Sequence, residues 1–263
     1  SRDDTIAIIR GSVASRDAWL DLVSQLEKLG ICCINSRSTI SMCADKYWTS
    51  LRLADASIPT PKTTLVQSED TLQESLDIIG EEYPMILKTS IGSQGVGVMW
   101  VESPKALVGI VQLLYREDKY VDIILQEYIK TDYDVRVIIV GGEIMGAMKR
   151  PIIDGDFRSN VSQGSEPEVH EITEMEAKES LRAAKSVDGD IVGVDFIPAK
   201  NREKDSPLFI EVNSTPGLMG IESTFADSQI DSKLYKKALK KEKGKFSITT
   251  EILKTYMNRE NWR

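Results

Sequence analysis

Apolar runs and helical periodicities alternate along the first part of the chain. Residues 5–9 and 31–34 are short apolar runs with the length of buried strands. Between them, apolar residues recur at a helical spacing that ends at Gly30; they are Trp19, Leu22, Val23, Leu26 and Leu29. This order predicts a β-α-β unit. A second helix is expected over 44–55, and Pro59 and Pro61 end it.

The rest of the chain predicts more strands than helices. Helical patterns cover 68–80, 104–116 and 174–186. Strand patterns cover 84–88, 97–101, 121–126, 134–140, 143–150, 193–199 and 208–212. The pair Gly141-Gly142 separates two of these strands and is a hairpin signal. The pattern predicts a mixed α+β chain without internal repeats.

Composition narrows the class of protein. The chain has 41% hydrophobic and 28% charged residues, which is ordinary for a globular protein, and no apolar run reaches the ~18–20 residues of a membrane span. A net charge of −8 argues against nucleic acid as the partner. Residues 227–263 are nevertheless basic, which is typical of a solvated helix face or of a contact with an acidic partner or RNA. We expect a cytoplasmic protein with no membrane contact.

Cysteine and histidine usage excludes several chemistries. Cys32, Cys33 and Cys43 cannot all form disulfides with one another, and their apolar surroundings are typical of reduced core residues. His170 is the only histidine, which argues against a Ser-His-Asp or Cys-His hydrolase. Because His170 lies in a polar stretch, we expect it at the surface.

The most informative motif lies at residues 209–217, which read Phe-Ile-Glu-Val-Asn-Ser-Thr-Pro-Gly. Side chains two apart in a strand share a face, so Glu211 and Asn213 present their oxygens side by side. Asp195 adds a third oxygen donor from an earlier strand. Such donors suit Mg²⁺ held against phosphates. A strand end with two solvated polar residues is the alternative.

Further candidates favour a bound phosphate. Gly92, Gly95 and Gly97 join two predicted strands and allow backbone amides to approach an anion, although such a loop taken alone is more often a flexible turn. Lys88 precedes this loop and can reach phosphate oxygens. The pair Asp134-x-Arg136 suggests an ion pair on one strand face. A cationic group follows at Lys149, Arg150 and Arg158, where a surface charge cluster is the alternative.

The order of these motifs resembles the ATP-grasp carboxylate–amine ligases, and most closely the RimK-type ribosomal-protein glutamate ligases. The similarity covers residues 5–225. Its signatures are Ala-Asp-Lys46, Gly-Ala-Met-Lys-Arg150, Asp-Phe-Arg-Ser-Asn160 and Glu-Val-Asn-Ser-Thr-Pro-Gly-Leu-Met-Gly-Ile-Glu222. The chain departs from the family at Ser162-Gln163-Gly164-Ser165, where relatives carry His-Arg-Gly-Gly, and in its basic end.

The resemblance implies a role for each motif. Lys46 and Lys88 would hold the ATP phosphates under a glycine lid, and Asp195, Glu211 and Asn213 would bind two Mg²⁺ or Mn²⁺ ions. The remaining nucleotide-binding residues would be Gln94, Gly95, Gly97, Glu127, Tyr128, Ile129, Asp134, Arg158, Ser159 and Asn160. Arg150 and Arg158 would be catalytic. Strand alternation further suggests that Phe209 shares the face of Glu211 and packs on the adenine.

The resemblance also implies an α+β ATP-grasp fold whose two subdomains grip ATP. The expected divisions are a partial N-terminal α/β domain over 1–43, a central subdomain with the lid over 44–126, and a C-terminal subdomain with the metal site over 127–263. The implied activity is ATP-dependent addition of glutamate, or a similar amino acid, to a protein or peptide carboxylate through an acyl phosphate. A homo-oligomer is expected. A peptide macrocyclase and a nucleotide-binding regulator without turnover are the alternatives.

Overall fold

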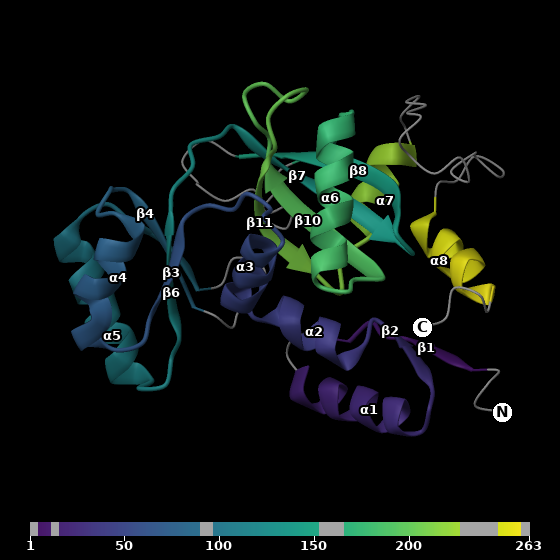
Figure 1. The fold of residues 1–263 in the computed structure, drawn as a ribbon, viewed down its shortest axis with the longest axis horizontal. Coiled ribbons are helices and arrows are strands. Elements are labelled where there is room, and N and C mark those ends of the chain that lie inside the picture. The colour runs from purple at the N-terminus through teal and green to yellow at the C-terminus, as the bar shows by residue number, and fades with distance from the viewer. Residues whose placement is uncertain (1–4, 12–15, 90–96, 153–165, 227–246, 259–263) are drawn as a thin grey trace.

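Three separate sheets organise the protein, whose computed structural model describes residues 5–11, 16–89, 97–152, 166–226 and 247–258. In Figure 1 the central sheet with its two helices lies at the left, the larger C-terminal sheet lies beside it, and the N-terminal unit lies below the C-terminal sheet. Mixed helices and sheets of these kinds confirm the predicted α+β class.

The N-terminal unit is the predicted β-α-β arrangement. β1 (Ile6–Ile8) pairs in parallel with β2 (Cys32–Ile34), and α1 (Arg16–Lys28) connects them. The predicted apolar face of α1 is partly wrong, because the exposed fractions of Trp19, Leu22 and Leu29 are 36%, 45% and 49%. The helix buries the predicted Val23 together with Leu20, which was not predicted, since this two-stranded sheet offers only a narrow surface to cover.

Two short helices continue from this unit. α2 (Arg37–Ala44), which the sequence pattern did not predict, begins at Ser36, whose hydroxyl accepts a hydrogen bond from the Thr39 amide. α3 (Lys46–Asp55) begins at Asp45, whose carboxylate accepts from the amides of Tyr47 and Trp48. These caps place Lys46 in the first turn of α3, at its amino end.

The central sheet is antiparallel and has the order β3-β6-β4-β5. Its strands are β3 (Thr63–Val66), β4 (Met85–Thr89), β5 (Val98–Val101) and β6 (Ile123–Glu127). One face packs on α4 (Leu72–Ile79) and α5 (Pro104–Glu117) through a core that includes Leu87, Leu107 and Leu125. The helix predicted over 68–80 is in fact a 3-10 turn, η3 (Glu69–Thr71), followed by α4.

The C-terminal sheet has the order β11-β10-β7-β8-β9 and is also antiparallel. Its strands are β7 (Tyr133–Val140), β8 (Glu143–Pro151), β9 (Glu168–Val169), β10 (Ile191–Ile197) and β11 (Leu208–Asn213). The accompanying helices are α6 (Glu174–Ser186), α7 (Met219–Ala226) and α8 (Ile248–Met257). A single hydrophobic core joins this sheet to Ile34, Cys43 and Leu53 of the N-terminal part.

His170 is buried, so its predicted surface position is wrong. Its exposed fraction is 4%, and its Nε2 atom lies 3.0 Å from Glu176 Oε2 at the start of α6. Arg202 also contacts this glutamate, with its Nε atom 2.8 Å from Oε1. Burial alone would raise the pKa of Glu176, but hydrogen bonds from Arg202, His170 and the Thr173 amide hold it at about 2. The polar partners of His170 therefore lie inside the protein.

The three expected divisions of the chain stay predictions. The strand β6 continues to Glu127, so the expected limit after residue 126 falls within a strand. None of the helices in the described ranges combines the length and the apolar character that crossing a bilayer requires.

Candidate active site

Asp195 and Glu211 lie directly opposite each other on the neighbouring strands β10 and β11. Asn213 lies opposite Gly193, two residues further along the same pair of strands. Directly opposed residues of an antiparallel pair share a face, so the three predicted metal donors are brought together. Glu211 and Asn213 are partly exposed, whereas Asp195 is buried.

Two arginines hold the carboxylate of Asp195. Arg136 Nε lies 2.7 Å from Oδ1 and Arg136 Nη2 lies 2.5 Å from Oδ2. Arg150 Nη2 lies 2.9 Å from the same Oδ2. Burial alone would raise the pKa of Asp195, but these two cations hold it below its usual value. Asp195 therefore carries a negative charge at neutral pH.

Arg150 bridges two carboxylates from two different strands. Besides Asp195, it binds Asp134 through Nε–Oδ1 and Nη2–Oδ2 distances of 2.7 and 2.6 Å. Its side chain is only 4% exposed. A buried guanidinium that pairs with two carboxylates in this way is suited to positioning them, and its predicted catalytic role remains untested.

Arg136 is the residue that sequence reasoning did not assign. The motif Asp134-x-Arg136 suggested an ion pair on one strand face. Each of the two residues instead pairs across the sheet, Asp134 with Arg150 and Arg136 with Asp195. The alternation of β7 shows that both side chains share a face, but only the register with β8 and β10 identifies their partners.

Lys88 brings the central sheet to this site. Its Nζ atom lies 2.7 Å from Gln126 Oε1. Burial lowers the pKa of Lys88, the carboxylate of Glu211 raises it and the ammonium of Lys46 lowers it again, to about 8. Helix α3, which begins at Lys46, contacts β11, which carries Glu211. Lys46 Nζ also lies 3.5 Å from the carbonyl oxygen of Thr89, at the end of β4.

The segment predicted to bind adenine follows β6. Glu127 Oε1 accepts a hydrogen bond of 2.7 Å from the Lys62 amide, so this carboxylate anchors the chain between α3 and β3. The ring of Tyr128 packs edge-on against Trp100, with centroids 4.6 Å apart. Ile129 is partly exposed beyond the end of the strand. Nucleotide binding by these residues stays a prediction.

The alternation argument for Phe209 is wrong. The pairing of β10 with β11 shifts register between Asp195 and Phe196, so that Phe196 lies opposite Phe209. A β-bulge of this kind breaks the two-residue alternation between Phe209 and Glu211. Phe209 is buried in the core, with its ring centroid 5.6 Å from that of Phe196. Strand alternation therefore no longer supports the predicted contact of Phe209 with adenine.

Several predicted residues lie outside the described part of the chain, namely Gln94, Gly95, Arg158, Ser159 and Asn160. Gly97 is described and has φ +79°, a conformation that favours glycine. A Cβ atom added to Gly97 would lie 2.4 Å from Thr89 Oγ1, so the close approach of the two strands also requires glycine there.

The donor set fits a magnesium ion. No described residue donates a hydrogen bond to the side chains of Glu211 and Asn213, so their oxygens are open. Asp195 uses three of the roughly four lone-pair positions of a carboxylate on its two arginines. No group of three or more His, Cys, Asp and Glu side chains in the described ranges could hold a metal by itself. The predicted site has only two carboxylates, those of Asp195 and Glu211, and its third donor is the amide of Asn213.

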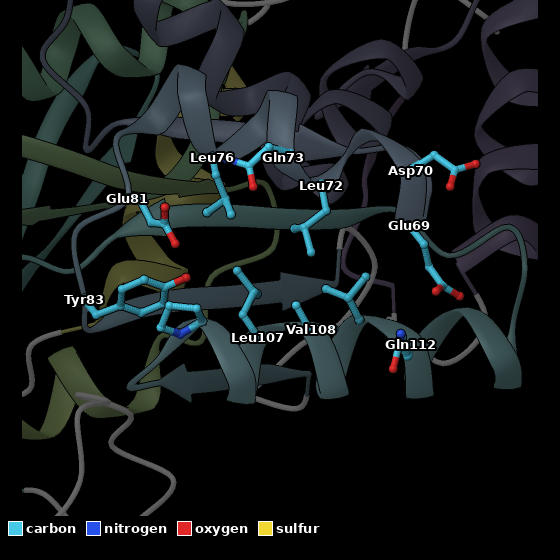
Figure 2. A pocket seen from close by; sticks show the side chains of 12 residues that line it. Glu69, Asp70, Leu72, Gln73, Leu76, Glu81, Tyr83, Leu107, Val108 and Gln112 are labelled. Carbon is cyan, nitrogen blue, oxygen red and sulfur yellow. The ribbon is translucent and has the colours of Figure 1, made fainter.

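A separate pocket of about 280 Å³ lies between α4 and α5 (Figure 2). Leu72, Leu76 and Leu107 contribute to its apolar lining, and Glu69 and Glu81 lie towards opposite ends. These helices pack on the Leu87 face of the central sheet, whereas Lys88 lies on the other face. The pocket is therefore separate from the candidate active site.

Comparison with known proteins identifies related sequences. Residues 43–237 match the family model described as the RimK-like ATP-grasp domain. A probable alpha-L-glutamate ligase of Coxiella burnetii (strain Dugway 5J108-111) is 35% identical over 204 residues, and the match covers 77% of this chain and 65% of the relative. A ribosomal protein bS6–L-glutamate ligase of Escherichia coli O139:H28 is 36% identical over 202 residues, covering 76% and 65%. The chain thus spans about 65% of the length of these relatives.

Solved structures share the fold. A RimK domain protein ATP-grasp from Sphaerobacter thermophilus has a TM-score of 0.60 at 20% identity, covering 81% of this chain and 74% of the other. A D-alanine–D-alanine ligase from Bacillus anthracis complexed with ATP has a TM-score of 0.59 at 24% identity, covering 75% and 64%. These similarities confirm the predicted ATP-grasp fold. With most of its length matched by one family model, the chain belongs to the RimK-like ATP-grasp family.

Proposed function

We propose that this protein is an ATP-dependent carboxylate–amine ligase that joins glutamate, or a similar amino acid, to a carboxylate of a protein or peptide. The observation that carries the proposal is the electrostatic interaction of Glu211 with Lys88. The carboxylate of Glu211, beside Asp195 on one sheet, acts electrostatically on the partly buried ammonium of Lys88 on another sheet. Opposite charges in one region suit a metal ion and the phosphates that it accompanies. The names of the relatives supply the expected amino acid and the expected protein acceptor.

The residues divide between nucleotide and metal. Lys46 and Lys88 would contact the phosphates as point charges. Glu211 and Asn213 would be the open ligands of Mg²⁺, with Asp195 contributing its remaining lone pair. The metal supplies neutralisation of phosphate charge when it is bound. Binding of two ions, rather than one, is part of the proposal, as is a homo-oligomeric state.

The proposed chemistry needs no nucleophile from the protein. An oxygen of the acceptor carboxylate attacks the γ-phosphorus of ATP, and ADP leaves. The amino group of the incoming amino acid then attacks the acyl carbon, which forms the C–N bond and releases phosphate and a proton. The protein's task is to bind both substrates in reacting geometry and to keep water from the acyl phosphate. The buried ion pairs that Arg150 forms with Asp134 and Asp195 hold these two carboxylates in place.

Product analysis tests the proposal. The protein is incubated with ATP, Mg²⁺, a peptide ending in glutamate, and each amino acid singly, and ADP and product masses are followed. ADP release that depends on an amino acid, with a mass increase of the peptide, is the expected result. Loss of water within the peptide alone would point to a macrocyclase. Nucleotide binding without ADP release under any of these conditions would point to a regulator.

A matched pair of variants connects the activity to the site. Glu211→Gln should abolish ADP release, because it removes the charge of an open metal ligand. Glu168→Gln is the control, since Glu168 lies on the same sheet but is exposed and pairs only with Lys149 among the described residues. Equal turnover by the two variants would contradict the metal assignment.

A further inference from the structure

The N-terminal unit contacts the ends of the two strands that carry the metal donors. Asn35 follows β2 and is only 1% exposed. Its Oδ1 atom accepts hydrogen bonds from the Asp190 and Ile191 amides, at 2.8 and 2.9 Å. Its Nδ2 atom donates to the carbonyl oxygens of Ile191 and Ser214, at 2.7 and 2.8 Å. One side chain thus joins the start of β10 to the residue that follows Asn213.

A second contact of the same kind lies two residues further along. Arg10, just after β1, donates a hydrogen bond of 2.6 Å from Nη2 to the Pro216 carbonyl oxygen. Pro216 in turn packs closely on Gly193, where an added Cβ atom would lie 2.8 Å from Pro216 Cβ. Since Gly193 lies opposite Asn213, segment 214–216 is held against the strands that it follows.

The open donors depend on this backbone for their position. No described residue donates a hydrogen bond to the side chain of Glu211 or Asn213. Metal ligands are normally oriented by hydrogen bonds to the ligand side chains themselves. Here that orientation comes from the course of β11 and from the point where the chain turns away from it. The turn is tied to the N-terminal unit at the carbonyl groups of Ser214 and Pro216.

We propose that Asn35 and Arg10 are positioning residues for the metal site, through which the N-terminal unit sets the geometry of Glu211 and Asn213. The inference rests on the metal assignment of the proposed function. It gives the N-terminal unit an indirect part in nucleotide chemistry, since neither residue contacts the metal donors. The shared hydrophobic core of Ile34 with the C-terminal sheet holds the unit in register for these two contacts.

Two variants with matched controls test the proposal. Asn35→Asp keeps the shape and the accepting oxygen but removes the amide that donates to Ser214. Thr49→Val is its control, because Thr49 is similarly buried and its hydroxyl bonds only to Met42 and Asp45 among the described residues. Arg10→Ala removes the contact with Pro216. Its control is Arg37→Ala, at an exposed arginine of the same part of the chain whose hydrogen bond to Glu27 comes from the backbone.

Two measurements are made on the whole chain. Mn²⁺ is titrated by electron paramagnetic resonance in the presence of a non-hydrolysable ATP analogue. Hydrogen exchange of peptides over 208–217 is followed by mass spectrometry. We expect Asn35→Asp and Arg10→Ala to weaken Mn²⁺ binding by about tenfold to hundredfold. Exchange should become faster in 208–217 and stay unchanged in the central sheet, and both controls should behave as wild type.

Other outcomes overturn the inference in distinguishable ways. If both variants bind Mn²⁺ within about twofold of wild type, the positioning role is overturned and the proposed function is not, because the metal site then does not depend on these contacts. Faster exchange throughout the C-terminal sheet also overturns it, since the residues would then act on stability in general. A wild-type protein that binds no Mn²⁺ with the nucleotide overturns the metal assignment of the proposed function and this inference with it.

Discussion

The ammonium of Lys88 loses its proton close to neutral pH. Burial lowers the pKa of Lys88, and the opposing effects of Glu211 and Lys46 leave it at about 8, against 10.5 for an exposed lysine. Between these two values the unfolded chain binds one more proton than the folded protein. Lys88 therefore makes the free energy of unfolding rise with pH from about 8 to 10.5, and its burial costs stability below pH 8.

The same shift predicts a pH-dependent affinity for nucleotide. A neutral amine no longer attracts phosphate as a charge, so the affinity for an ATP analogue should fall above pH 8, approaching about tenfold per pH unit. Calorimetric titrations between pH 7 and 9.5 measure this slope. Lys88→Arg stays charged over the whole range and should flatten the profile. Equal slopes for the two proteins would contradict a phosphate contact by Lys88.

Arg150 is predicted to contribute strongly to stability. Arg150→Met would leave the buried carboxylates of Asp134 and Asp195 without a shared cation, at an expected cost of about 3–5 kcal/mol. Denaturant unfolding at pH 7 measures this loss. The double variant Asp134→Asn with Arg150→Met removes one of the stranded charges and should recover part of the stability. A double variant less stable than Arg150→Met would contradict the charge-pair explanation.

Some features of the site were readable in the sequence and others were not. Asp195, Glu211 and Asn213 could be grouped because alternation along a strand and the order of the motifs are sequence properties. The partners of Arg136 and the position of Phe209 depend on the register of β10 with its neighbours, including a bulge. A register is set by packing between strands far apart in the chain, and a single sequence does not display it.

At the scale of elements, local signals succeeded where one residue type imposes a backbone conformation. Helix α6 has the predicted bounds because Thr173 and Glu176 form a capping box at its start. The hairpin between β7 and β8 turns at Gly141 and Gly142, both with positive φ. Helix α2 was missed because its eight residues form too short a pattern to show a period, and its cap at Ser36 is the only local signal.

Alanine substitutions at two glycines should change the free energy of unfolding in opposite directions. Gly141→Ala should destabilise the protein by about 1–2 kcal/mol, because φ is +57° and the new Cβ would lie 2.8 Å from Thr255 Cγ2. Gly109→Ala should stabilise it by about 0.5–1 kcal/mol, because Gly109 is exposed within α5 and has open space around it. Chemical denaturation of both variants checks this. Changes of the same sign would contradict the turn geometry.

At the scale of the whole molecule, nucleotide and metal are predicted to stabilise the protein together. A magnesium–nucleotide complex binding Lys88 from one sheet and Glu211 from another favours only the folded state. At a concentration of about one hundred times Kd it should add about 2.7 kcal/mol and raise Tm by about 5–10 °C. Thermal unfolding with and without EDTA separates the part due to the metal. In the presence of EDTA we expect Glu211→Gln to have the same Tm as the wild type. In magnesium we expect the nucleotide to raise the Tm of this variant less than that of the wild type.

The arrangement of the three sheets was the least predictable level. The chain order and the glycine and proline positions indicate strands, but not that β3 pairs with β6, or that β7 lies between β10 and β8. These pairings close long loops, and their stability comes from cores that form only after the strands meet. The resemblance to a family supplied the ATP-grasp fold without these pairings, and the comparisons with solved structures confirmed that fold.

The hydrogen bonds of Asn35 also bear on how the protein is made. Its amide bonds to the carbonyl oxygens of Ile191 and Ser214, which lie 156 and 179 residues later in the chain. At about 5–20 residues per second, a ribosome needs roughly 10–35 seconds to reach them. During that interval the polar end of Asn35 has none of its C-terminal partners. These contacts of Asn35 with the C-terminal sheet can therefore form only after Ser214 has been translated, long after Asn35 itself.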